Sequence, residues 1–108
     1  MVDYCYDCID RAFVGTGLKI SLSITAEGFD MDRDNFEVEF RCGTKSVTVP
    51  KFEMYVAEDD TWIVPLDTSK LGAGKVVMIT TAYIPDEDWK GGVRPEVSKK
   101  ELLILNNA

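Results

Sequence analysis

Two segments with strictly alternating hydrophobicity constrain the fold of this chain more than any other feature. Residues 18–24 carry leucine or isoleucine at every even position, with lysine or serine between them. Residues 36–42 carry Phe, Val, Phe and Cys at even positions, with charged residues between them. A period of two directs one set of side chains into a core and the other into water, whereas the apolar positions of a helix recur three and four apart. The two segments therefore predict antiparallel β-strands with solvated outer faces.

Further segments extend this pattern into an all-β domain. The strands that we expect are 18–24, 36–42, 45–49, 52–57, 61–66, 75–84 and 101–105, and the Gly43-Thr44 pair predicts a tight hairpin turn. Residues 67–74 read as one short helical turn, with Asp67 as its N-cap and Gly72 as its stop. About seven short strands with turn signals every 8 to 12 residues are typical of an immunoglobulin-like antiparallel β-sandwich. The Cys…Trp…Cys spacing of antibody domains is missing.

Two positions predict details of the sheets. Pro65 lacks a backbone N–H, so the strand 61–66 is expected to be short or to lie at an edge. Residues 75–84 are apolar on both faces, so this strand is expected to be central or to pair its outer face with another surface. We assign residues 15–108 to a single β-sandwich domain and residues 1–14 to an N-terminal arm of undetermined structure.

The composition and net charge of the chain disfavour some classes of binding partner. The chain has 108 residues, 45% hydrophobic and 29% charged, with a formal net charge of −7. This acidity disfavours nucleic acids and anionic membranes as partners, because both attract basic surfaces. No apolar run approaches the roughly 20 residues of a membrane span. Residues 1–10 lack the features of a signal peptide, so we expect a cytoplasmic protein, or a secreted or periplasmic one if a leader was trimmed.

The titratable residues give little support for catalysis. Histidine is absent, and with it the commonest general base and zinc ligand. Cys5 and Cys8 are spaced like half a zinc knuckle or a redox pair, but Cys42 is the only further thiol. We therefore expect no enzyme, no catalytic residues, no cofactor and no metal site, and three reduced thiols.

Two segments resemble fragments of known ligand-binding motifs. Asp30, Asp32 and Asp34 resemble the start of an EF-hand loop, but a strand follows where that loop needs a helix. A solvated turn is the favoured interpretation, and weak calcium binding of another kind stays open. The segment 72–75 looks like part of a P-loop, but it lacks the first glycine and the Ser or Thr after the lysine, so we reject it.

An acidic loop at residues 85–92 is the strongest candidate for a contact surface. An aromatic side chain beside charged neighbours often anchors a protein interface. The residues that we expect to contact a partner are Tyr83, Asp86, Asp88, Trp89, Gly91 and Gly92.

One stretch of the chain supports a family resemblance. Residues 71–97 contain Leu-Gly-Ala-Gly, a strand, Ile-Pro-Asp-Glu-Asp-Trp and Arg-Pro-Glu-Val in succession. This order resembles small structural proteins of phages and prophages of gut Bacteroidetes, and residues 15–20 and 35–40 fit the early strands of that pattern. The layout is also similar to the N-terminal β-sandwich of phage baseplate upper proteins. At residues 90–94 the chain departs from the acidic Asp-Gly-Arg of the pattern.

Two functional hypotheses follow. The resemblance implies a non-enzymatic virion, tail or baseplate module that binds other phage structural proteins or its own copies, in a virion or in the bacterial cytoplasm during assembly. The alternative is a cell-surface or periplasmic immunoglobulin-like module that binds carbohydrate or protein. In that case Trp62, Trp89 and Tyr83 are the candidate contacts.

Overall fold

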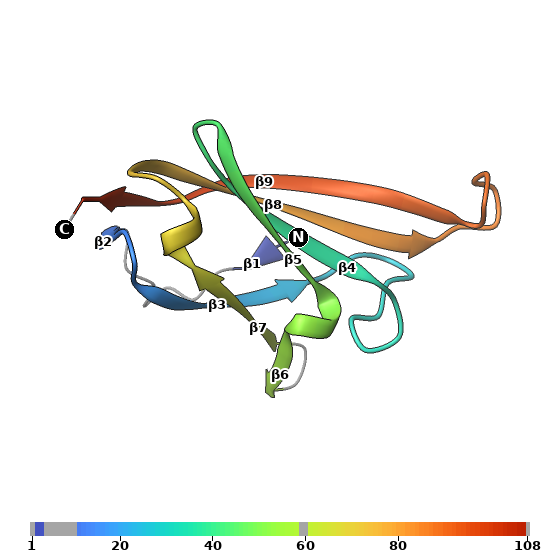
Figure 1. Cartoon of the computed structure of the whole chain (residues 1–108). Coiled ribbons are helices and arrows are strands. Elements are labelled where there is room, and N and C mark those ends of the chain that lie inside the picture. The colour runs from blue at the N-terminus through green and yellow to red at the C-terminus, as the bar shows by residue number, and fades with distance from the viewer. Residues whose placement is uncertain (1, 4–10, 59–60, 108) are drawn as a thin grey trace.

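Two β-sheets pack face to face in the computed structural model, which describes residues 2–3, 11–58 and 61–107 (Figure 1). The smaller sheet has four strands in the order β1-β3-β7-β6, and the larger has five in the order β2-β9-β8-β4-β5. The strands are β1 (Val2–Asp3), β2 (Arg11–Phe13), β3 (Gly17–Ile24), β4 (Phe36–Cys42), β5 (Lys45–Pro50), β6 (Tyr55–Glu58), β7 (Thr61–Asp67), β8 (Gly74–Pro85) and β9 (Val93–Asn106). Two short 3-10 turns, η1 (Lys51–Glu53) and η2 (Thr68–Lys70), complete the described elements. The expected all-β sandwich is confirmed.

The strand order is that of an immunoglobulin-type sandwich. Strands β1, β3, β7 and β6 correspond to the four-stranded sheet of that fold, and β4, β8 and β9 to the opposite sheet. One pairing departs from the expected antiparallel arrangement, because β2 runs parallel to the end of β9. Strand β1 belongs to the four-stranded sheet and β2 to the five-stranded sheet, so residues 1–14 contribute one short strand to each sheet.

Alternation places the core where the sequence predicts it. The even-numbered side chains of β4, namely Phe36, Val38, Phe40 and Cys42, are all buried, as are those of β3 from Ile20 onward. Trp62 of β7 packs edge-on against Phe36, with ring centroids 5.3 Å apart. These apolar contacts between the two sheets exclude water from the interior and supply most of the driving force for folding.

Strand β8 lies at the centre of the five-stranded sheet, as its two apolar faces predict. It pairs with β4 along one edge and with β9 along the other. The β9 pairing runs from Gly74 with Leu105 to Pro85 with Val93, interrupted by one bulge near Val77. The resulting hairpin runs along one side of the molecule, and its loop lies at the opposite end from the C-terminus (Figure 1).

Three sequence expectations need correction. Phe52 does not begin a strand, because the chain forms the 3-10 turn η1 at residues 51–53 and β6 starts only at Tyr55. The Phe52 side chain is 86% exposed in that turn. The final strand begins at residue 93, not at 101. Pro65 lies in β7, which is an interior strand, but β6 pairs with β7 only as far as Ile63, so Pro65 has a neighbour on the β3 side alone.

The short helical turn forms at its predicted start. The Asp67 carboxylate accepts hydrogen bonds from the backbone N–H of Ser69 at 3.0 Å and from its hydroxyl at 2.6 Å, which confirms Asp67 as the N-cap. The turn ends at Leu71, one residue before the expected Gly72. The buried Thr68 hydroxyl donates to the Thr16 carbonyl at 2.7 Å and so ties η2 to the start of β3.

We predict that Thr80→Val stabilises the protein. Within the described part of the chain, the Thr80 hydroxyl is buried and has no hydrogen-bond partner. Replacing it with a methyl group of similar size removes an unpaired polar group from the core, which is worth about 1 kcal/mol in the free energy of unfolding. Urea denaturation measures this gain. The exposed Thr48→Val on β5 is the control and should stay within about 0.5 kcal/mol of wild type. A destabilised Thr80→Val would contradict the prediction.

Candidate partner-docking surface

The loop between β8 and β9 is held in one conformation by its own hydrogen bonds. The Asp86 N–H donates to the Gly92 carbonyl at 3.0 Å, and the Gly92 N–H donates to the Trp89 carbonyl at 2.8 Å. The Asp86 carboxylate accepts from the Asp88 N–H at 3.0 Å and from the Arg94 guanidinium at 3.2 Å. Asp86 therefore shapes the loop, which fixes the positions of the side chains around it.

The tip of this loop presents the residues that the sequence predicts as contacts. Trp89 is 49% exposed, and Asp88 is exposed beside it. Gly91 and Gly92 have φ angles of 88° and 79°, in the left-handed region that glycine adopts without steric cost. Five of the six predicted contact residues thus belong to one rigid turn, which we call the hairpin tip (residues 86–92).

Tyr83, the sixth predicted contact, lies elsewhere. It points to the outer face of the five-stranded sheet, and its hydroxyl donates a hydrogen bond to the Glu37 carboxylate on β4. This hydrogen bond, together with burial and the negative charge of Glu37, raises the pKa of Tyr83 above its usual value of about 10. Tyr83 is therefore half-buried and joins β8 to β4, and the structure does not place it in the hairpin tip.

A second surface adjoins the tip and was only partly predicted. Residues paired across neighbouring strands point to the same face of a sheet. The register therefore gathers the odd-numbered side chains of β4, β8 and the first half of β9 on one side, which we call the outer face: Glu37, Glu39, Arg41, Val77, Ile79, Thr81, Tyr83, Val93, Pro95, Val97, Lys99 and Glu101. Val97 is 57% exposed and Val93 is 42% exposed.

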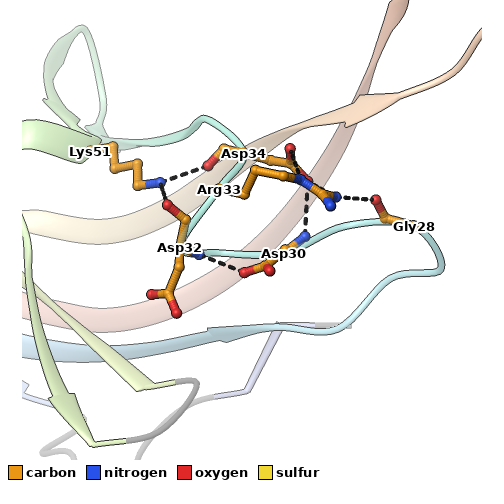
Figure 2. A network of polar contacts seen from close by, with 6 residues as sticks. All are labelled: Gly28, Asp30, Asp32, Arg33, Asp34 and Lys51. Atoms are coloured by element: carbon orange, nitrogen blue, oxygen red, sulfur yellow. Dashed lines mark hydrogen bonds and ion pairs between the residues drawn. The ribbon is translucent and has the colours of Figure 1, made fainter.

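The acidic turn at residues 26–35 is a closed network of hydrogen bonds (Figure 2). Arg33 donates to both oxygens of the Asp34 carboxylate at 2.9 Å, and the Asp30 N–H donates to Asp34 at the same distance. The Asp32 N–H donates to the Asp30 carboxylate at 2.9 Å. Hydrogen bonding by Arg33 lowers the pKa of Asp34 below its ordinary value. The expected polar turn is present and its carboxylates make mainly local contacts, but Asp34 is only 8% exposed, so the turn is solvated in part.

Lys51 holds this turn against the sandwich. Its ammonium donates to the Asp34 carbonyl at 2.8 Å and to the Asp32 carbonyl at 3.2 Å (Figure 2). It also lies 5.3 Å from the centroid of the Phe36 ring and 5.2 Å from that of Trp62, a cation–π arrangement. The loop after β3 and the turn η1 are thus joined through one lysine, a contact that no sequence motif indicated.

An apolar depression of about 410 Å³ opens beside η1 and is lined by Asn35, Lys51, Phe52, Met54 and Trp62. Trp62, a predicted contact of the binding-module hypothesis, is only 9% exposed and belongs to the core. Phe52 is the exposed aromatic here. Sequence reasoning missed it because the alternation of Phe52, Met54 and Val56 assigned it to a strand.

The remaining motifs form no further site in the described residues. Cys42 is buried, and its thiol donates to the Gly72 carbonyl at 3.2 Å. Cys5 and Cys8 lie outside the described residues. Across residues 2–3, 11–58 and 61–107, no three or more acidic or cysteine side chains are grouped so that they could hold a metal ion. No helix in the described part of the chain has the length and hydrophobicity needed to cross a membrane.

Comparison with known proteins informs the fold alone. No protein-family model matches the chain, and no curated protein sequence matches it. Among solved structures, the chain is similar to part of an endo-beta-1,4-mannanase from Thermotoga petrophila, with a TM-score of 0.56 and 10% identity. The match covers 99% of this chain and 20% of the mannanase, so this chain spans about a fifth of that enzyme's length. At this identity the likeness extends to the β-sandwich and not to activity.

We predict that Asp34 makes stability depend on pH. Because its folded-state pKa is lowered, its ionised form stabilises the fold above the unfolded pKa of about 3.9, and this contribution is lost as the pH falls through the lower folded value. Asp34→Asn should therefore be less stable than wild type at pH 7, with a difference that shrinks below pH 4. Chemical denaturation at several pH values measures it. The exposed Asp32→Asn is the control, and a pH-independent deficit in Asp34→Asn would contradict the assignment.

Proposed function

We propose that this protein is a non-enzymatic assembly module of the phage virion or tail type, which docks on a larger structural protein. The observation that carries the proposal is the hairpin tip, where a half-exposed Trp89 is presented on a loop fixed by its own hydrogen bonds. The resemblance of residues 71–97 to phage structural proteins covers this same hairpin and supports the virion setting.

The construction of the tip suits protein recognition. A large aromatic side chain is the commonest anchor of a protein interface, and one presented in a fixed position loses little conformational entropy on binding. The Asp86–Arg94 ion pair and the Asp86–Gly92 hydrogen bond fix the loop before a partner arrives. Asp88 beside Trp89 adds a negative charge that favours a partner with a basic rim around an apolar pocket.

We predict that Trp89→Ala removes the protein from assembled particles. Truncating a central aromatic anchor typically costs 2 kcal/mol or more, about a thirtyfold loss of affinity. The measurement is the share of protein that sediments with purified phage particles, by quantitative mass spectrometry. Phe52→Ala removes an exposed aromatic far from the tip in sequence and should leave this share unchanged. Absence of the wild-type protein from particles, or incorporation of Trp89→Ala at the wild-type level, would contradict the proposal.

A second candidate function is carbohydrate binding at a cell surface. The observation that favours it is Phe52, which is 86% exposed beside the depression next to Trp62, since aromatic faces stack on sugar rings. The similar fold within a mannanase makes mannan the first glycan to test.

Affinity electrophoresis through gels that contain soluble mannan tests the second candidate. Retarded migration that Phe52→Ala abolishes and Trp89→Ala retains would favour carbohydrate binding over docking through the tip. Unchanged migration of the wild-type protein in mannan and in other soluble glycans would reject it.

A further inference from the structure

The outer face carries a mostly apolar column on β8, with charged side chains beside part of it on β4 and on β9. Along β8, Val77, Ile79 and Tyr83 point outward, with Thr81 between them. Ile79 is only 9% exposed although none of the described strands covers this face, because Glu39 on β4 and Lys99 on β9 flank it. The column is therefore an apolar strip on the solvent side of the sheet.

The charges beside this column alternate in sign from row to row. In one row Lys99 lies on β9 and Glu39 on β4, with Ile79 between them. In the next row Glu101 lies on β9 and Arg41 on β4, on either side of Val77. Each row thus carries opposite charges at its two ends, and the direction reverses between rows. Within the chain Arg41 already donates to the Glu39 carboxylate at 2.8 Å, and Lys75 lies 3.2 Å from the Glu101 carboxylate, so charges on a second copy add to these ion pairs.

This pattern is complementary to itself, and we propose that two copies of the chain associate face to face through the outer face. A two-fold axis parallel to β8 and passing over it places β8 on β8 of the second copy and β9 on β4 of the second copy. Lys99 then opposes Glu39 of the second copy, and Glu101 opposes Arg41, each twice by symmetry. Such an isologous contact is the commonest form of homodimer, and face-to-face sheets pack with their strands nearly aligned.

Other arrangements fit this face less well. A two-fold axis across the strands, centred on the Ile79 row, places β9 on β9 and opposes Lys99 to Lys99. Like charges facing each other cost affinity, so this alternative is disfavoured. In the favoured arrangement Val97 faces Glu37 of the second copy, whose carboxylate accepts one hydrogen bond from the Tyr83 hydroxyl.

The size of the face predicts a weak dimer. The outward face has three rows on β4 and five on β9, with rows about 7 Å apart and strands about 4.8 Å apart, so the part to which all three strands contribute measures about 15 by 20 Å. This is about 300 Å² per copy, below the roughly 1,000 Å² in total of a stable specific interface and in the range of weak, transient contacts, so we expect a dissociation constant of about 100 μM or weaker.

The dimer has a consequence for docking. An axis parallel to β8 leaves both hairpins pointing the same way, so the two Trp89 side chains emerge at one end of the pair. Two linked tips would bind a repetitive partner more tightly than one tip alone. The inference goes beyond the docking role proposed above, and either one can fail without the other.

Sedimentation equilibrium of charge-reversal variants tests the pairing. The average mass of the wild-type protein should rise from the 12.1 kDa of the monomer toward twice that value as its concentration increases to about 500 μM. Lys99→Glu and Glu39→Lys should each raise the dissociation constant by about tenfold or more, because two attractive contacts become repulsive. Lys19→Glu on the other sheet and Glu27→Lys in the acidic turn change the net charge equally and should dimerise as wild type.

Mixing the two variants gives the decisive result. In a mixed pair, Glu at position 99 faces Lys at position 39, and Lys99 faces Glu39, so dimerisation should return to within about threefold of wild type. Rescue by mixing cannot arise from an effect within one folded chain. A wild-type protein that stays monomeric, charge reversals without effect, or a mixture that remains monomeric would each overturn the proposal.

The same experiment separates this inference from the docking function. Trp89→Ala lies outside the paired face, so it should keep the wild-type dissociation constant for dimerisation while it loses incorporation into particles. Loss of dimerisation in Trp89→Ala would place the self-contact at the tip and would overturn the face-to-face arrangement.

Discussion

The pairing of β8 with β4 on one side and β9 on the other organises this molecule. The inward side chains of β8, including Val76 and Met78, are fully buried and pack with the alternating side chains of β4 in the core. Its outward side chains form the apolar column of the outer face, and its last residues carry the hairpin tip. Core, outer face and tip therefore share one strand, and a shift of one residue in its register would exchange the inner and outer sets.

The first half of β9 extends the larger sheet beyond the buried core. All but one of residues 93–101 are exposed, although these residues stay paired with β8 throughout. Pro95, Lys99 and Lys100 on this segment are the residue types that discourage open-ended strand pairing. The open edge of β9 therefore resists non-specific strand pairing. The complementary charges of the adjoining outer face favour a defined contact with a second copy.

Much of the fold was predictable because burial on one side imposes a period of two. Residues 18–24 and 36–42 follow that rule, whereas residues 75–84 are predicted by their two apolar faces, and the structure confirms all three strands. Residues 93–100 have no buried face and so left no such pattern, while β1 and β2 are too short to show one. At the candidate site, Gly91, Gly92 and Trp89 indicated the turn, but the hydrogen bond from Tyr83 to Glu37 and the row of Lys99, Ile79 and Glu39 depend on register between distant strands.

The central claim is that this sandwich binds through the outer face of its larger sheet and through its hairpin tip, as two separate surfaces. Amide NMR spectra recorded along a dilution series test the first of these without any substitution. The account predicts that amides of β4, β8 and residues 95–101 shift together with concentration, while those of β3, β7 and the tip stay fixed. Spectra that do not change with concentration, or shifts centred on β3 and β7, would contradict it.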